Sequence, residues 1–392
     1  MRKCIVTGRT KVPRTSKRAL SRYALIAGLS FVGLTSVAAH AQTLLAADSK
    51  YPRIRLLPSG ELVASVLSFP GDDHIKIFSS TDSGASFTLV GTIQDPEFQA
   101  LKASSPSLFR VPQTVGSLPA GTLILGVVVD TQKTATSRAK IKIYKSTDDG
   151  RNWSFVSVAV QSANSQGLWE PDFSMGTDGA IILNYADESS SCCSQKLVHR
   201  RTYDGVTWID HSNTVALATS NADATYPLRP GMPVVSNLAD GTRLMTYEVC
   251  GQAAPLNCAS YYRTSTDGWN YGATTLIGTR MVHADGRFFS NTPVNKVLPD
   301  GSLLWIGQYL RLSNGNPSGL NGTVLMKSAS GSPNGPWVTI PAPVTLATPT
   351  TNGCEGFSPG LQWVGAGATM VQLQTRYENG VCNVYFATGS TN

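Results

Sequence analysis

Three features are missing from this 392-residue sequence, and each absence excludes a class of protein. Beyond the N-terminus, no apolar stretch is long enough to cross a membrane as a helix. No CxxC pair with histidine spacing is present, so a zinc site is not expected, and nothing else indicates a metal or cofactor. No long stretch has helical periodicity, so the chain is predicted to be all-β.

Acidic residues are absent from the first 41 positions, which contain eight Lys and Arg residues. A short apolar run, Ala24–Val37, precedes Ala39-His40-Ala41, which has the small-x-small pattern of a signal-peptide cleavage site. Residues 1–41 are therefore predicted to be a signal peptide. We expect the mature chain to be secreted or periplasmic, and not attached to a membrane after cleavage.

The basic surplus of the whole chain belongs to this segment. The sequence has 32 Lys and Arg residues against 25 Asp and Glu, a net charge of +7. Without the eight N-terminal cations, 24 basic residues face 25 acidic ones. The mature chain therefore lacks the positive charge expected of a nucleic-acid-binding protein.

A proline followed by a turn glycine occurs six times along the rest of the chain. Five of the pairs are eight residues apart, and an insertion at Val111–Ala120 lengthens the second. The pairs are Pro52/Gly60, Pro106/Gly121, Pro171/Gly179, Pro233/Gly241, Pro293/Gly301 and Pro359/Gly367. The glycines recur at intervals of 61, 58, 62, 60 and 66 residues, a period typical of a radial β-repeat.

Each repeat has the pattern of one propeller blade. In the first repeat, short apolar segments at 53–57, 62–67, 74–78 and 87–93 predict four antiparallel strands. The last repeat is one strand short, whereas Gln42–Ala47 is a spare apolar strand that can complete it. Residues 42–392 are therefore predicted to form a single six-bladed β-propeller, closed by its N-terminal strand.

A second signature, S-x-D-x-G-x-x-aromatic, lies between the third and fourth strands of two repeats. It occurs at Ser80–Phe87 and Ser146–Trp153, with degenerate versions at 202–208 and 265–270. The motif resembles the Asp-box turn (BNR repeat) of sialidase-like propellers. Asp82 and Asp148 are expected to accept hydrogen bonds from turn amides, a folding role and not a catalytic one.

Six cysteines remain after the signal peptide is removed. An even number in an exported chain predicts disulfides, although six cysteines allow fifteen pairings. Closeness in sequence favours Cys250–Cys258 and Cys354–Cys382, which leaves a vicinal pair at Cys192 and Cys193.

The innermost strands of a propeller bring corresponding residues to one rim. Residues just before each proline and about seven after each glycine should meet there. This rule collects mostly polar and aromatic residues: Tyr51, Ser105, Trp169, Glu170, Arg229, Gly231, Asn291, Glu355, Ser358, Asp72, Asp73, Asp130, Asp187, Glu188, Glu248, Gln308, Tyr309, Gln374, Arg376 and Tyr377. A polar, aromatic-lined rim is suited to binding a carbohydrate.

Two glutamates in adjacent repeats stand out at this rim. Glu170 begins the inner strand of the third repeat, and Glu248 ends the second strand of the fourth. Partial burial could separate their pKa values, and a carboxylate pair is the usual machinery of glycoside hydrolysis. The alternative is that either glutamate only caps a strand or pairs with Arg229.

At these residues the chain resembles glycoside hydrolase family 93, the exo-acting α-1,5-L-arabinanases of the sialidase-like superfamily. The matching segments are Trp169-Glu170-Pro171, Tyr185–Glu188, and Arg229–Pro233 leading to Tyr247-Glu248. The resemblance implies a retaining hydrolase of a plant-type polysaccharide that releases arabinose or arabinobiose. The chain is also expected to be a monomer. It maps the two catalytic glutamates to Glu170, assigned as the nucleophile, and Glu248, assigned as the acid/base.

The resemblance also implies a set of sugar-binding residues that hold hydroxyls or stack on the ring. These are Trp169, Asp187, Arg229, Asn291, Tyr309 and Tyr377. A structural role at the rim is the alternative for each of them.

Two other functions remain open. An exo-sialidase would need three arginines around a carboxylate, which Arg53 or Arg55, Arg229 and Arg376 could supply beside Tyr377. However, Tyr51-Pro52-Arg53-Ile54-Arg55 does not reproduce the aromatic-Arg-Ile-Pro motif of sialidases. A non-catalytic carbohydrate-binding propeller would repeat one pocket in every blade, whereas these rim residues differ between blades.

Overall fold

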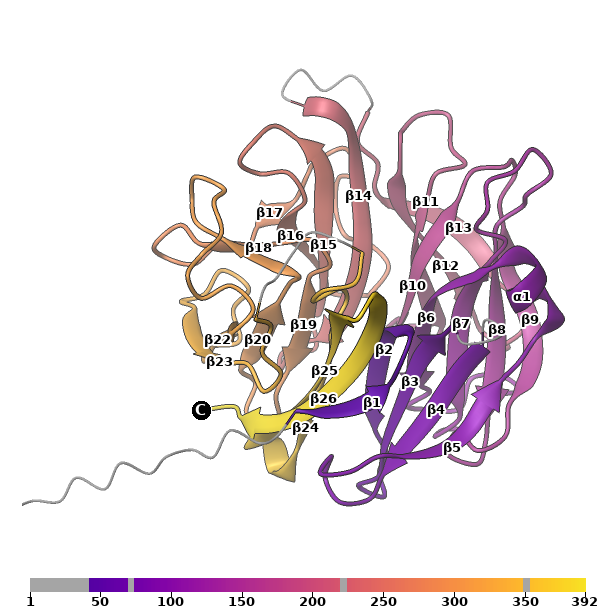
Figure 1. Cartoon of the computed structure of the whole chain (residues 1–392). Coiled ribbons are helices and arrows are strands. Elements are labelled where there is room, and N and C mark those ends of the chain that lie inside the picture. The colour runs from indigo at the N-terminus through magenta and orange to yellow at the C-terminus, as the bar shows by residue number, and fades with distance from the viewer. Residues whose placement is uncertain (1–41, 70–73, 219–223, 348–352) are drawn as a thin grey trace, which may run out of the picture. The chain divides into compact units, whose positions relative to one another are not determined.

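The computed structural model describes residues 42–69, 74–218, 224–347 and 353–392, and its regular secondary structure is almost entirely β-strand (Figure 1). The predicted signal peptide, residues 1–41, and the predicted rim residues Asp72 and Asp73 lie outside the described residues. A short helix, α1 (Pro96–Leu101), precedes the second blade. No helix in the described part of the chain is long and apolar enough to cross a membrane.

Six antiparallel sheets follow one another along the chain, which confirms the predicted six-bladed, sialidase-like β-propeller. Blade one contains β2 (Ser49–Leu56), β3 (Leu62–Ser68), β4 (His74–Ser80) and β5 (Thr88–Ile93). Blade two contains β6 (Ala103–Arg110), β7 (Leu123–Val129), β8 (Lys140–Ser146) and β9 (Ser154–Gln161). Blade three contains β10 (Leu168–Met175), β11 (Ile181–Asp187), β12 (Lys196–Thr202) and β13 (Ile209–Val215).

The fourth blade departs from this plan. Its inner strands are β14 (Ala224–Asn237), β15 (Arg243–Gln252) and β16 (Ala259–Ser265), and a short β17 (Thr279–Arg280) pairs with β16. The sheet continues through β18 (Phe288–Ser290) to β21 (Tyr309–Arg311), so it extends toward blade five. Blade five itself contains β19 (Val294–Val297), β20 (Leu303–Ile306), β22 (Val324–Ser328) and β23 (Val338–Pro341).

The sixth blade is completed from both ends of the chain. Its strands are β24 (Gly360–Val364), β25 (Thr369–Glu378), β26 (Val381–Ser390) and β1 (Thr43–Ala46). β1 pairs antiparallel with β26, as predicted for the spare N-terminal strand. The innermost strands β2, β6, β10, β14, β19 and β24 each contact the next, and β24 contacts β2, so the ring is closed.

Each innermost strand has a backbone kink just before the repeat proline. The residues there have positive φ although none is glycine: Tyr51, Ser105, Glu170, Met232, Asn291, Thr292 and Ser358. In four blades the strand register shifts across the kink, as in a β-bulge. Proline suits this position because it has no N–H to leave unpaired. The proline repeat therefore marks six kinks that redirect side chains at the rim.

The opposite end of the blades carries the turns. The six repeat glycines have φ between +83° and +93°, which a residue with a Cβ rarely adopts. The outer turns are closed by Asp82 and Asp148, which accept hydrogen bonds from the amides of Ser86 (3.0 Å) and Asn152 (2.9 Å). Both aspartates have the predicted folding contacts and lie away from the rim.

Candidate active site

Glu170 lies at the kink of β10, with a φ of +58° and a half-buried side chain. Its Oε2 accepts a hydrogen bond from the backbone N–H of Met232 at 2.6 Å. Met232 lies at the equivalent kink of β14 in the next blade. Two neighbouring kinks thus orient this carboxylate: one carries its side chain and the other donates to it.

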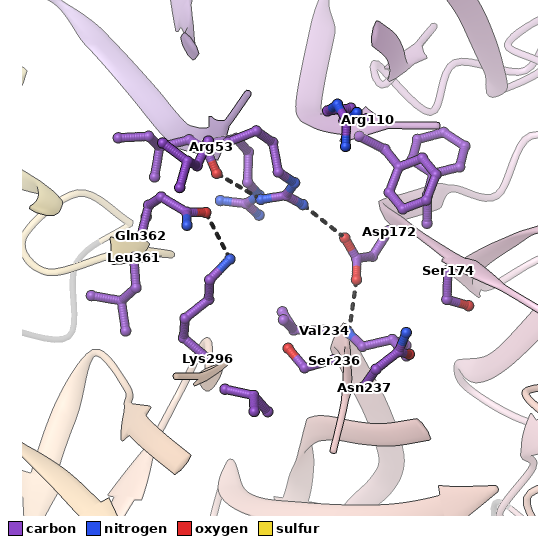
Figure 2. Close-up of a pocket in the computed structure, with 18 of the residues that line it drawn as sticks. Arg53, Arg110, Asp172, Ser174, Val234, Ser236, Asn237, Lys296, Leu361 and Gln362 are labelled. Atoms are coloured by element: carbon purple, nitrogen blue, oxygen red, sulfur yellow. Dashed lines mark hydrogen bonds and ion pairs between the residues drawn. The ribbon is translucent and has the colours of Figure 1, made fainter. Parts of the chain in front are cut away.

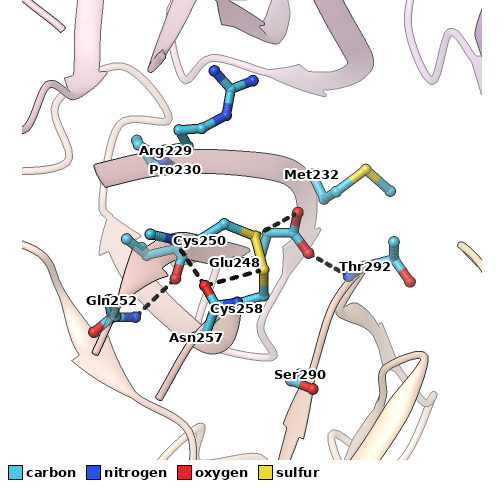
Figure 3. Close-up of a disulfide and its surroundings, with 12 residues drawn as sticks. Arg229, Pro230, Met232, Glu248, Cys250, Gln252, Asn257, Cys258, Ser290 and Thr292 are labelled. Atoms are coloured by element: carbon cyan, nitrogen blue, oxygen red, sulfur yellow. Dashed lines mark hydrogen bonds between the residues drawn. A yellow bond between two sulfur atoms is a disulfide. The ribbon is translucent and has the colours of Figure 1, made fainter. Parts of the chain in front are cut away.

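Glu248 lies on β15, directly opposite Gly231 in the strand pairing, and is also half-buried. Its Oε2 accepts a hydrogen bond from the Thr292 backbone N–H at 2.6 Å (Figure 3). Its Oε1 lies 3.5 Å from the Sγ of Cys250, which is bonded to Cys258. A kink of blade five therefore holds Glu248 as a kink of blade four holds Glu170.

Gly231 brings the two carboxylates together. A Cβ at this position would lie 3.1 Å from Oε2 of Glu170 and 3.8 Å from Oε1 of Glu248. The separation of these oxygens therefore cannot exceed the sum of those distances. Paired carboxyl groups are about 5–5.5 Å apart in retaining glycosidases and about 6.5–9.5 Å apart in inverting ones. The largest possible separation of the two oxygens therefore lies near the lower end of the inverting range. Every separation in the retaining range is shorter than this limit.

Burial raises the pKa of both glutamates above the ordinary value. It raises the pKa of Glu170 to about 7, against the opposing effects of the Met232 N–H and the charge of Arg229. Burial raises the pKa of Glu248 to about 8, and the negative charge of Glu170 raises it further. An ionised Glu170 therefore favours a protonated Glu248, the division that acid–base catalysis requires.

Arg229 neutralises neither glutamate directly. It forms an ion pair with Glu188 and donates hydrogen bonds to Ser194 Oγ at 3.0 Å and Gln195 Oε1 at 2.6 Å. Glu188 also pairs with Lys133 at 2.5 Å, and these two cations help to lower its pKa to about 2. The alternative in which Arg229 pairs with Glu170 or Glu248 is therefore wrong, because the ion pair of Arg229 is with Glu188.

The other predicted sugar-binding residues are distributed along the rim. Trp169 adjoins Glu170, with the Lys133 ammonium 5.3 Å from its ring centroid. Asp187 is buried and accepts hydrogen bonds from the N–H and hydroxyl of Ser189 at 2.7 and 2.6 Å. Asn291 lies beside Thr292, the residue that holds Glu248.

Tyr309 and Tyr377 lie further round the rim, in the last two repeats. The Arg311 guanidinium lies 4.7 Å from the Tyr309 ring centroid. The Tyr377 N–H donates a 2.6 Å hydrogen bond to Glu355, and its side chain is 52% exposed. No contact links either tyrosine to Glu170 or Glu248 among the described residues.

Tyr51 was placed at the rim from the sequence but was not assigned a role in the site. Burial raises the pKa of its hydroxyl, and the negative charges of Glu170 and Glu248 raise it further. The phenol therefore lies close enough to both carboxylates for their charges to act on it. Its position before Pro52, equivalent to that of Glu170 before Pro171, places it at the rim but does not show that its hydroxyl lies near both glutamates.

The three arginines that a sialidase site would need have separate partners. Arg53 donates to Ser358, and Arg229 pairs with Glu188. Arg376 pairs with Glu378 at 2.6 Å and donates to Gln42 at 3.1 Å. Among the described residues, no group of three or more His, Cys, Asp or Glu side chains is placed to hold a metal ion.

Neither the comparison with known family models nor the comparison with curated proteins finds a match. Solved structures do match. The α-L-arabinanase of Penicillium chrysogenum, complexed with arabinobiose, is 24% identical with a TM-score of 0.73, over 89% of this chain and 97% of that one. The GH93 α-L-arabinofuranosidase of Fusarium graminearum, also with arabinobiose, is 20% identical with a TM-score of 0.72, over 90% and 98%.

A sialidase from Streptococcus pneumoniae is also similar, at 11% identity and a TM-score of 0.55, over 90% of this chain and 70% of that one. The expected resemblance to glycoside hydrolase family 93 is confirmed in these structural neighbours. At such identities the likeness establishes the sialidase-like propeller fold.

Proposed function

We propose that this protein is an exported, retaining glycoside hydrolase that releases arabinose or arabinobiose from the chain ends of α-1,5-linked arabinan. The observation that carries the proposal is the pair Glu170 and Glu248. They flank one glycine, both have raised pKa values, and neither forms an ion pair with a described residue. Arabinan is chosen as the substrate because two structural neighbours were solved with arabinobiose.

In the proposed reaction, ionised Glu170 attacks the anomeric carbon and forms a glycosyl ester, while the bond to the leaving oxygen breaks. Glu248 gives its proton to that oxygen and then takes a proton from the water that hydrolyses the ester. The order of the two pKa values supports these roles, because the charge of Glu170 helps Glu248 to keep its proton.

The surrounding residues would hold the sugar. Trp169, next to Glu170, offers an aromatic face. Asn291 adjoins Thr292, whose N–H donates to Glu248. Asp187, Arg229, Tyr309 and Tyr377 are proposed to contact more distant parts of the oligosaccharide. Arg229 would do so while its ion pair with Glu188 keeps it away from the two carboxylates.

The test is hydrolysis of linear arabino-oligosaccharides by Glu170→Gln and Glu248→Gln, with sialosides assayed in parallel. We expect kcat to fall at least about 1000-fold in both variants while circular dichroism stays native. Glu97→Gln, which changes a lysine-paired carboxylate on α1, is the matched control and should keep wild-type kcat. Full activity in either site variant, or cleavage of sialosides alone, contradicts the proposal.

Azide rescue of the alanine variants distinguishes the two roles. On an aryl arabinoside, whose leaving group needs no proton, azide should restore turnover in Glu248→Ala because it needs no general base, and it should give a glycosyl azide of retained configuration. In Glu170→Ala, azide should replace the nucleophile and give the inverted product. The opposite pattern would exchange the two assignments.

A further inference from the structure

A second polar site lies on the axis of the propeller, separate from the two glutamates. A cavity of about 550 Å³ is lined by the innermost strands of all six blades, between their prolines and their turns (Figure 2). Neither Glu170 nor Glu248 lines it, because both stand at the rim before the prolines. The cavity is open to solvent.

The charges in this cavity are unbalanced. Arg53, Arg55, Arg110 and Lys296 all line it, and Asp172 is the only carboxylate among its described lining residues. Figure 2 shows Arg53, Arg110, Asp172 and Lys296 arranged around its centre. Asp172 can neutralise one of the four cations, and its nearest is Arg55 at 4.0 Å.

The remaining cations have only neutral partners. Arg53 donates to the carbonyls of Pro52 and Ser358 and to Ser358 Oγ, at 2.9–3.2 Å. Lys296 donates to Gln362 Oε1 at 2.8 Å. The Nε of Arg110 is buried and has no hydrogen-bond partner in the described structure. Several donors of these groups therefore remain available to a ligand.

Clustered cations in a partly dry cavity are unfavourable without counter-charge. Burial lowers the pKa of Lys296 to about 7, and the charge of Arg55 lowers it further. Asp172 opposes this effect but does not cancel it. An anion near Lys296 would relieve the repulsion and satisfy the free donors together.

We infer that the axial cavity binds a small oxyanion of the phosphate or sulfate type, held by Lys296 and the surrounding arginines. Guanidinium groups match the paired oxygens of such anions, and the ammonium of lysine adds a compact charge. Such an anion would contact blade five through Lys296 and blade one through the arginines of β2, of which Arg55 already acts on Lys296 through its charge. It would therefore join two blades on the axis and stabilise the closed ring.

Thermal unfolding at constant ionic strength and pH 6.5 tests this inference, with sodium chloride replaced stepwise by phosphate or by sulfate. We expect a saturable rise in Tm with either oxyanion, because a ligand that binds the folded state alone stabilises it. The rise should be lost in Lys296→Gln and Arg55→Gln. It should persist in Lys76→Gln, which removes the same charge from β4, outside the cavity.

A crystal soaked in selenate gives a readout that does not depend on variant stability. Anomalous density is expected between Lys296 and the arginines in wild type and should be absent in Lys296→Gln. The inference is overturned if chloride stabilises as well as phosphate and sulfate, if all three variants respond like wild type, or if selenate leaves the axis empty. None of these results bears on the proposed hydrolase, because the test measures no turnover.

Discussion

At the scale of single residues, the site depends on backbone conformation as much as on side-chain type. Glu170 has positive φ, which costs about 1–3 kcal/mol for a residue with a Cβ and persists only where surrounding structure enforces it. The equivalent kinks supply the N–H groups of Met232 and Thr292 to the two carboxylates. Strain at three of the six kinks thus places either an acid or the donor that holds an acid.

Gly231 is the residue whose replacement tests this geometry most directly. In Gly231→Ala, the new Cβ would lie 2.7 Å from Gln195 Nε2 and 3.1 Å from Glu170 Oε2, so both groups must move. We expect kcat on arabino-oligosaccharides to fall about tenfold or more, because small displacements at a reacting centre are costly. Gly319→Ala is the control, since nothing lies within 4 Å of its Cβ position. Equal activity in the two variants would show that Gly231 does not set the spacing.

The two raised pKa values predict the pH dependence of the reaction. The proposed mechanism needs Glu170 ionised and Glu248 protonated. Activity should therefore fall below pH about 7, as Glu170 gains a proton, and above pH about 8, as Glu248 loses one. We expect a narrow bell in kcat/KM, whose limbs report the coupled pair. An acid limb near pH 4.5, the ordinary value of glutamate, would contradict the burial effect.

At the scale of elements, disulfides connect neighbouring segments at the rim. The structure contains the three expected pairs, Cys192–Cys193, Cys250–Cys258 and Cys354–Cys382. Cys250–Cys258 joins β15 to the start of β16 beside Glu248, and Cys354–Cys382 joins the segment before β24 to β26. The turns at the other end are closed instead by aspartates such as Asp148. The Cys250–Cys258 disulfide is thus the bridge that lies beside the candidate site.

Removing the Cys250–Cys258 bridge should affect activity as well as stability. A Cys250→Ser, Cys258→Ser double variant should lose about 2–3 kcal/mol of unfolding free energy, because the bridge closes a loop between cysteines eight positions apart. Its kcat should fall because Sγ of Cys250 contacts Glu248.

Asp148→Ala serves as the control for this bridge. It removes turn hydrogen bonds worth about 1 kcal/mol far from the rim and should leave kcat unchanged. Chemical denaturation and initial rates measure both effects. If the double variant loses stability but keeps wild-type kcat, the bridge has a structural role only.

At the scale of the whole molecule, β1 completes the last blade of the ring from the other end of the chain. This strand covers the edge of β26, which would otherwise present unpaired N–H and C=O groups. A chain that starts at Asp48, without β1, should have a lower Tm. Its copies should also associate with one another through the exposed edge of β26. A chain that starts at Gln42, the expected mature N-terminus, should remain stable. Calorimetry and light scattering compare the two, and indistinguishable results would mean that β26 tolerates exposure.

The sequence predicted much of the site because its spacing follows the blades. Proline and glycine positions located the rim, and the rule of residues before prolines and after glycines brought Glu170 and Glu248 together. It could not assign a partner to Arg229, because Glu188 and Ser194 lie in a loop whose path the spacing does not describe. Nor did it predict the extension of blade four through β18 and β21, whose strands are only three residues long.

The sequence by itself determined the repeat, the strand order and the closing strand, since turn chemistry and alternating burial are local properties. Tertiary structure alone decided the raised pKa values, the partner of Arg229 and the cationic cavity on the axis. Each of these depends on side chains from different blades meeting within a few ångströms. The two glutamates are 78 positions apart in the sequence, and only the closed ring with its kinked inner strands brings their carboxylates to the same glycine.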